Sequence, residues 1–444
     1  MQPMAPQLDN IIDNELRASA TYRELASGRL PEVSDGDFAL AMKCVRHPAR
    51  RRDYRALEAL TAIGAKASWI SIDQQLEVAR RTRTPIRHFR ESYDKLNRWL
   101  VSLPEYAASF PIAHFGSAPR ADETLMRGSV STTIILAGND FVQAPIVIAN
   151  TVIADARCIV KPSGIDPIPP FLFCKALLEH GCESPNVLYL DSSSERDRGL
   201  VRRAIENTEQ SLVFGEDKTV AAVYGALSTR AGHKELPFWS GRSGAIVLAD
   251  ADLELAADTI LLGAIFLGGR TCLATKKVFA STQIAGELLR LLMEKADRLT
   301  RGAFDHQDTQ LGPQPEHLLA VRQPLAAAGA AHYDAELLIV GGVSPESRVI
   351  QEEPPFPMFF FVTGDEARLA EMANRSVSGT PSRKAMAMAV FTSDKQKFYA
   401  LAREIAAFRV ILNQTTCPWH NFSTRHQGIH LCEEMMRPMA VTAD

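Results

Sequence analysis

The segment AIVLADADLELAADTILLGAIFLGGRTCLATKKVFA, residues 245–280, carries the pattern that decides the fold. It opens with the apolar run Ala245–Leu248, which predicts a buried strand. Asp252–Leu267 then predicts a helix, because apolar residues recur every three or four positions. A second strand is expected over Lys276–Ala280. Apolar strands joined by a helix are typical of a parallel sheet that is covered by helices on both faces.

The same alternation of strand and helix runs through most of the chain from residue 130 onward. Ten strands are predicted, enough for two parallel sheets, and the division between them is expected near Pro237. The first 120 residues look helical and polar instead. Ligands of open α/β sheets bind beyond the carboxyl ends of the strands, so those loops are the expected place for a site. The predicted strands are Thr132–Ala137, Arg157–Lys161, Asn186–Leu190, Ser211–Phe214, Ala245–Leu248, Lys276–Ala280, Glu336–Val340, Met358–Val362, Ala387–Phe391 and Arg409–Leu412.

Composition excludes several classes of protein. The 444 residues carry a net charge of -3, which gives no indication of nucleic-acid binding. No apolar run is long enough to span a bilayer, and the N-terminus lacks the pattern of a secretory signal. The seven cysteines are scattered without metal-binding spacing. They indicate free thiols in a reducing compartment, so we expect a cytoplasmic protein without a metal.

Cys272 is the candidate nucleophile. It lies in a loop that follows Gly268 and Gly269, where a substrate can approach the thiol and backbone N–H groups can hold an oxyanion. That arrangement suits covalent thioester chemistry. The alternative is a structural cysteine without a chemical role.

Three predicted strand ends carry further candidates. Asn139 follows the first strand and offers an amide donor, with Asp140 as the neighbouring alternative. Lys161 and Ser163 follow the second strand and could hold a ribose or a phosphate. Gly215 precedes a helix N-terminus, a generic phosphate site. Taken singly, these are equally well explained as a turn, an exposed lysine and a helix start.

Taken in order, these residues resemble the aldehyde dehydrogenase superfamily. The resemblance covers roughly residues 130–430 and is strongest from Gly241 to Lys277, with the segment Glu352–Pro357 also matching. It implies an α/β fold, aldehyde dehydrogenase-like, with two Rossmann-like parallel-sheet domains and a helical N-terminal region. The expected division is 1–237 for the N-terminal helices and the cofactor domain, 238–412 for the catalytic domain, and 413–444 for a C-terminal return that lines the site.

The resemblance also implies a role for each candidate. Cys272 is similar to the catalytic thiol, and Asn139 to the asparagine that holds the oxyanion together with the Cys272 N–H. Lys161 and Ser163 resemble adenosine-ribose contacts, and Gly215 the glycine beneath the pyrophosphate. Glu353 matches the glutamate that binds the nicotinamide ribose, or it is a plain acid before a strand.

Departures from the family pattern carry most of the functional information. Phe238 stands where hydrolytic members have the glutamate that activates water, and Glu235 is three residues too early to replace it. Gly164 stands where a glutamate often takes the ribose 2′-OH, which favours NADPH, with NADH as the alternative. His420, His426 and His430 have no spacing typical of zinc ligands. They suit a proton transfer to the leaving thiolate or a contact with a carrier phosphate better.

These traits are most similar to the acyl-CoA reductase branch that includes the fatty-acyl reductase of bioluminescent bacteria. We therefore expect NAD(P)H-dependent reduction of an acyl thioester, carried on coenzyme A or on an acyl or peptidyl carrier protein, to an aldehyde. The alternatives are a hydrolytic NAD(P)-dependent aldehyde dehydrogenase and a catalytically inactive homologue that acts as a binding subunit. A homodimer or homotetramer is expected.

Overall fold

The computed structural model describes residues 8–25, 28–46, 55–109, 124–128, 130–227, 232–333, 336–417 and 425–439. The chain divides into two compact units. The first unit comprises Met1–Thr82, Glu91–Phe238 and Asn421–Asp444, and the second comprises Arg83–Arg90 and Trp239–His420. The expected C-terminal return is thus shared between the units, and the functional division drawn from the sequence stays a prediction.

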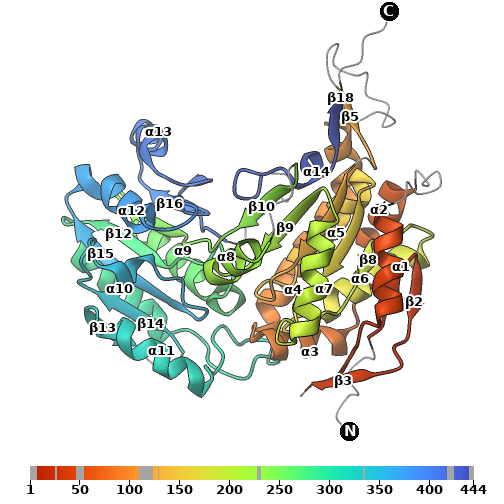
Figure 1. Ribbon diagram of the computed structural model, residues 1–444. Coiled ribbons are helices and arrows are strands. Elements are labelled where there is room, and N and C mark those ends of the chain that lie inside the picture. The colour runs from red at the N-terminus through yellow and green to blue at the C-terminus, as the bar shows by residue number, and fades with distance from the viewer. Residues whose placement is uncertain are drawn as a thin grey trace, which may run out of the picture. The chain divides into compact units, whose positions relative to one another are not determined.

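The first unit is built on a seven-stranded sheet (Figure 1). Five of its strands are parallel neighbours, and β1 and β2 extend the sheet in antiparallel fashion. The order is β10 (Lys234–Phe238), β9 (Gln210–Phe214), β6 (Ser131–Ile135), β7 (Arg157–Lys161), β8 (Asn186–Val187), β1 (Asn10–Ile12) and β2 (Glu15–Arg17). Proline is tolerated at position 237 because β10 is an edge strand.

The N-terminal region contains the expected helices and, before them, strands that were not predicted. It holds four strands, β1, β2, β3 (Tyr22–Leu25) and β4 (Gly28–Pro31), before α1 (Asp35–Arg46), α2 (Ala56–Lys66), α3 (Ile72–Thr82) and α4 (Ile86–Ala108). Ile11 pairs with Val187 and is fully buried. A three-residue strand shows no periodicity, so only its pairing with a distant strand reveals it.

Helices cover both faces of the first sheet. One core joins α1 and α7 (Glu195–Glu206) to strand residues such as Ile12 and Ile159. Right-handed crossovers place α5 (Gln143–Ala154) and α6 (Ile168–Glu179) on the face opposite α7 and α8 (Asp217–Gly225). The C-terminal α14 (Leu431–Glu434) packs on α5, and β18 (Arg437–Met439) pairs with β5 (Thr124–Met126).

The second unit has its own seven-stranded sheet, parallel except for β13. Its order is β13 (Ala330–Tyr333), β14 (Leu338–Gly341), β15 (Met358–Gly364), β12 (Lys277–Ser281), β11 (Gly244–Val247), β16 (Met388–Phe391) and β17 (Val410–Leu412). One core contains α9 (Leu253–Ile265) and α10 (Ala285–Asp297), and the other contains α11 (Glu316–Ala326) and α12 (Leu369–Ser378). The predicted α/β fold with two parallel-sheet units is confirmed, and each of the ten predicted strands overlaps an observed one.

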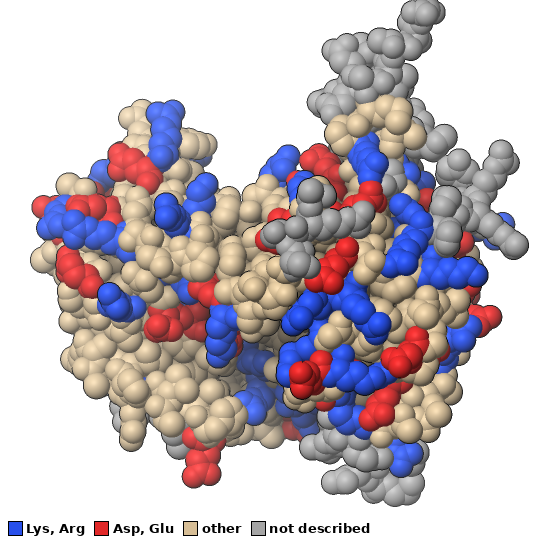
Figure 2. All heavy atoms as spheres, in the orientation of Figure 1, with Lys and Arg blue, Asp and Glu red and all other residues tan. Residues whose placement is uncertain are grey.

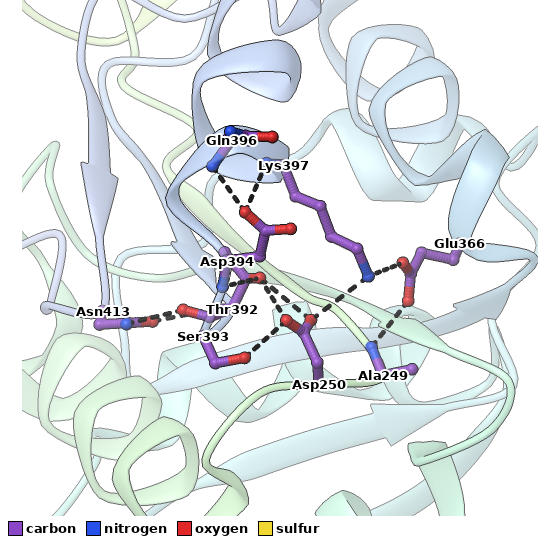
Figure 3. A network of polar contacts seen from close by, with 9 residues as sticks. All are labelled: Ala249, Asp250, Glu366, Thr392, Ser393, Asp394, Gln396, Lys397 and Asn413. Carbon is purple, nitrogen blue, oxygen red and sulfur yellow. Dashed lines mark hydrogen bonds and ion pairs between the residues drawn. The ribbon is translucent and has the colours of Figure 1, made fainter.

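A network of hydrogen-bonded polar side chains occupies part of the carboxyl edge of the second sheet (Figure 3). Asp250, which follows β11, accepts hydrogen bonds from the hydroxyls of Thr392 and Ser393, which follow β16. Lys397 of α13 (Lys395–Glu404) lies 3.7 Å from Asp250 and 3.0 Å from Glu366. Because these side chains form hydrogen bonds and ion pairs with one another, this part of the edge connects the strands to α13 and has a structural role.

On the face drawn in Figure 2, Lys and Arg are interspersed with Asp and Glu, and neither sign covers the face alone. Within the part of the chain that the structure describes, no helix is both long and apolar enough to cross a membrane.

Candidate functional site

Cys272 lies at the amino edge of the second sheet, not at the carboxyl edge where ligands were expected. Asp252 caps α9 by accepting the Leu255 N–H, and the helix runs into a short 3-10 segment, Phe266–Gly269. Cys272 follows this segment and precedes β12. The thiol is half-buried, and of the seven cysteines only Cys272 and Cys44 are not buried.

The loop before Cys272 depends on left-handed backbone. Leu267, Gly268 and Gly269 all have φ between 50° and 67°. A Cβ at Gly268 would lie 2.4 Å from the Arg83 carbonyl oxygen, and one at Gly269 would lie 2.6 Å from the Pro357 nitrogen. The two glycines are therefore required both by conformation and by close approach of other backbone.

The glycine loop before β11 holds the backbone of Cys272. A Cβ at Gly241 would lie 1.9 Å from the Cys272 carbonyl oxygen, so only glycine fits there. The Ser243 hydroxyl donates to the same oxygen at 3.0 Å and accepts the Ala387 N–H at 3.1 Å. The sequence resemblance singled out this loop, and the contacts give the physical reason for its glycine.

Glu353 is brought to this loop from the segment before β15. Its carboxylate accepts the Gly241 N–H at 2.6 Å and the Arg242 N–H at 3.2 Å. Burial raises the pKa of Glu353, and the positive charges of Lys276 and Arg242 oppose that rise. The carboxylate is thus tied to the loop that touches Cys272. Each oxygen can accept a second hydrogen bond, which leaves capacity for a ribose hydroxyl.

Two lysines at the start of β12 were missed by the sequence analysis. Lys276 and Lys277 are both almost completely buried. Burial lowers the pKa of each amine to about 7. The sequence offered no signal for this, because two lysines beginning a strand normally indicate an exposed end.

The cofactor candidates of the first unit lie at the carboxyl edge of its sheet. Lys161 ends β7, and its buried Nζ donates to the Ser192 hydroxyl at 2.8 Å. Burial lowers the pKa of Lys161 to about 8, and the negative charge of Asp191 opposes this shift. Arg23, in the N-terminal hairpin β3–β4, pairs with Asp191. This edge therefore carries charges of both signs beside the candidate ribose site, and the Arg81 guanidinium also donates to the Gly164 carbonyl at 3.2 Å.

The glycines near Lys161 show where a side chain or a ligand would have space at this edge. A Cβ at Gly164 would meet nothing within 4 Å, whereas one at Gly138 would lie 2.4 Å from the Ser163 hydroxyl. Gly215 follows β9, and a Cβ there would lie 3.4 Å from Thr219. The turn at Gly138 is thus tight, and the space beside Gly164 is open.

Asn139 and Asp140 differ in what their side chains do. Asp140 Oδ1 accepts the Val142 N–H at 3.2 Å, just before α5. That carboxylate thus closes a tight turn just before the helix, as aspartate side chains commonly do by bonding to the backbone two residues on. Asn139 is half-buried at the end of the turn. Of the two residues, Asn139 remains the candidate oxyanion donor.

Phe238 is locked in an aromatic cluster of the first unit. Its ring stacks on Phe214, with centroids 4.1 Å apart, and the His426 ring lies 5.3 Å away. Phe238 is buried and Glu235 is exposed. Because side chains alternate along β10, Glu235 points away from the Phe238 side of the strand.

His426 and His430 lie in different environments. His426 contacts the Phe214 and Phe238 rings, while His430 Nε2 lies 3.1 Å from the Tyr106 hydroxyl. His420 falls outside the described residues. Across the described ranges, no three His, Cys, Asp or Glu side chains are grouped so that they could hold a metal ion.

Comparison with known proteins identifies the family of the chain. The model of the aldehyde dehydrogenase family matches residues 141–431. A vanillin dehydrogenase of Pseudomonas fluorescens is 26% identical over 282 residues, which are 59% of this chain and 57% of that protein. A betaine aldehyde dehydrogenase of Bacillus subtilis is 25% identical over 317 residues, 65% of this chain and 63% of that protein. The matched region thus spans about three-fifths of these relatives.

Solved structures share the fold at lower identity. A 1-pyrroline-5-carboxylate dehydrogenase variant of Thermus thermophilus superposes with a TM-score of 0.81 at 14% identity, over 99% of this chain and 93% of that one. A betaine aldehyde dehydrogenase variant of Staphylococcus aureus gives 0.80 at 18% identity, over 98% of this chain and 97% of that one. These likenesses concern the fold alone.

Proposed function

Because the chain belongs to the aldehyde dehydrogenase family, we propose that it is a nicotinamide-dependent oxidoreductase that interconverts an acyl thioester and an aldehyde through a thioacyl intermediate on Cys272. The observation that carries the choice of a thioester is Phe238. A buried, stacked phenyl ring replaces the carboxylate that would activate water, and the exposed Glu235 is on the other side of its strand. Without a base, a thioacyl group is passed to a thiol more readily than to water.

The protein's own part in the reaction follows from thiolate chemistry. The Cys272 thiolate adds to the thioester carbonyl carbon, and the carbonyl oxygen becomes an oxyanion. We assign the stabilisation of this oxyanion to the Asn139 amide and the Cys272 N–H. Collapse of the adduct breaks the bond to the carrier sulfur, which leaves as a thiolate and takes up a proton. Once a hydride has reached the thioacyl carbon, Cys272 would leave with the electrons of its C–S bond as a thiolate, and the aldehyde would be released.

A nicotinamide cofactor supplies the hydride when it is bound. The open space beside Gly164 and the buried Lys161 ammonium fit a phosphorylated ribose, so NADPH is our proposed reductant. Lys161 and Ser163 would hold the ribose, Gly215 would lie beneath the pyrophosphate, and Glu353 would take the nicotinamide ribose. Coenzyme A or a carrier protein would present the acyl group. A cytoplasmic homodimer or homotetramer completes the proposal.

Hydrolytic oxidation of an aldehyde is the second candidate. The names of the relatives favour it, because they describe dehydrogenases of vanillin and of betaine aldehyde. The two candidates share the attack of Cys272 and the hydride step. They differ only in whether water or a thiol removes the acyl group, so product analysis separates them.

The test measures both products from aldehyde and oxidised cofactor, with and without coenzyme A or pantetheine. We expect thioester with an added thiol and little free acid without one. Acid release at the same rate without any thiol would replace our proposal by the hydrolytic one. Mass spectrometry after incubation with acyl thioester alone should find the adduct on the Cys272 peptide. The Cys44 peptide, which holds the other partly exposed thiol, is the internal control.

A further inference from the structure

Lys276 is a buried cation in the second unit, and the proposed reaction assigns no role to it. The residue is 1% exposed and directly precedes β12, which begins at Lys277. Its Nζ donates to the Gly269 carbonyl at 2.6 Å and to the Phe356 carbonyl at 2.7 Å. An amine is costly to bury, so its retention here calls for an explanation.

The two carbonyl groups belong to the two segments that define the candidate site. Gly269 ends the left-handed turn that leads into Cys272, and Phe356 follows Glu353 by three residues. The Gly269 backbone also lies against the Phe356–Pro357 peptide, as the 2.6 Å contact of a Cβ with the Pro357 nitrogen shows. Lys276 therefore neutralises two carbonyl dipoles that converge where these segments touch.

A series of contacts connects the Cys272 loop, the Glu353 segment and Gly241 to one another. Lys276 joins the Cys272 loop to the Glu353 segment, and the Glu353 carboxylate binds the Gly241 N–H. Gly241 in turn is pressed against the Cys272 carbonyl. The loop itself contains left-handed Leu267, a conformation that persists only where surrounding contacts hold it.

We propose that Lys276 is a positioning residue that holds the Cys272 loop against the Glu353 segment and so sets the place of the thiol. This rests on Cys272 being the nucleophile of the proposed function. The role needs the amine as a hydrogen-bond donor between two carbonyl oxygens. The negative charge of Glu353 faces Lys276 and favours its protonated form.

Lys277 provides a matched control within the same strand. It is equally buried, and its pKa is also lowered to about 7 by burial. Its Nζ, however, donates to the carbonyl and hydroxyl of Ser376 on α12. Replacing either lysine by methionine removes a buried amine from β12 or its start, but only the change at 276 releases the Cys272 loop.

The experiment compares Lys276→Met with Lys277→Met in the full chain. Hydrogen-exchange mass spectrometry of peptides spanning 266–276 and 352–357 reports the loop contacts without any substrate. We expect at least about 10-fold faster exchange there for Lys276→Met, and wild-type exchange for Lys277→Met. The burst of reduced cofactor from aldehyde and oxidised cofactor should slow by about 10- to 100-fold for Lys276→Met only, because a misplaced thiol loses its approach to the carbonyl.

The burst belongs to both the thioester and the hydrolytic reactions, so the test does not depend on which product forms. Unchanged exchange and burst rate in Lys276→Met would overturn the proposal. Equal effects of the two substitutions on the 266–276 peptide would also overturn it, because they would indicate general loosening of the unit. If Lys276→Met does not fold, Lys276→Gln keeps an N–H donor group on a shorter, uncharged side chain, and we expect an intermediate exchange rate and burst. Wild-type values for that variant would count against the proposal.

Discussion

The backbone of Gly241 lies directly against that of Cys272, so that a Cβ at 241 would be 1.9 Å from the Cys272 carbonyl oxygen. The contact links two segments that are 31 residues apart in the chain. The Glu353 carboxylate binds the Gly241 N–H from a third segment. The position of the candidate nucleophile is therefore decided by backbone packing among three loops at the amino edge of one sheet.

Gly241→Ala should displace the Cys272 loop, because the added methyl group collides with backbone that cannot rotate away. We expect a loss of turnover on the order of 100-fold, as for other misplacements of about 1 Å. Steady-state rates and thermal unfolding measure the effect. Gly199→Ala is the control, since a Cβ there meets nothing within 4 Å inside α7, and it should stabilise the protein by about 0.5–1 kcal/mol. Wild-type turnover in Gly241→Ala would contradict the close contact.

Phe238→Glu should allow water to hydrolyse the thioacyl group on Cys272, because it puts a carboxylate where the proposed enzyme has none. Burial beside Phe214 would raise the pKa of that carboxyl and limit the gain. Free-acid release from aldehyde and oxidised cofactor, without a thiol, is the measurement. Glu235→Gln should leave acid release unchanged. A large drop in acid release in Glu235→Gln would identify this residue as the base.

Glu353→Gln should lower turnover at saturating cofactor, because an amide offers one oxygen where the carboxylate accepts the N–H groups of both Gly241 and Arg242. A lost buried hydrogen bond of this kind costs about 1–3 kcal/mol. Initial rates over a range of cofactor concentrations separate the effect on turnover from that on affinity. The exposed neighbour Glu352 is the control, and Glu352→Gln should have wild-type kinetics.

Gly164→Glu should weaken the binding of NADPH more than that of NADH. The side chain has room, since nothing lies within 4 Å of its Cβ, and its charge would repel a 2′-phosphate. Calorimetry with 2′,5′-ADP and 5′-AMP tests the site without catalysis. We expect a loss of about 10-fold or more for 2′,5′-ADP alone. Equal binding of the two nucleotides by the natural protein would contradict the proposed NADPH preference.

Lys277→Met should flatten the dependence of stability on pH. Burial lowers the pKa of Lys277 to about 7, well below its ordinary value, so between pH 7 and about 10.4 the unfolded chain binds one more proton than the folded chain. Stability therefore rises with pH across this window and is lost as pH falls through it. Urea unfolding from pH 7.5 to 9.5 should show a slope smaller by up to about 1.4 kcal/mol per pH unit. Exposed Lys175→Met should keep the wild-type slope.

Local sequence patterns determined the architecture of this protein to a large extent. The apolar runs of β7 and β16 were long enough to be recognised, and the Asp252 cap marks the start of α9. These features depend on neighbours within a few residues, which a sequence displays directly. The glycines before Cys272 likewise indicated a turn with left-handed backbone, because few other residues adopt that conformation.

Only the tertiary structure decided how distant segments meet. The pairing of Ile11 with Val187, the burial of Lys276 and the stacking of Phe238 on Phe214 join residues that have no local relationship. The close approach of Gly241 to the Cys272 backbone also depends on the parallel pairing of β11 with β12. Such contacts arise from packing and sheet register, whose free energy is spread over the whole core and leaves no periodic signal in any one segment.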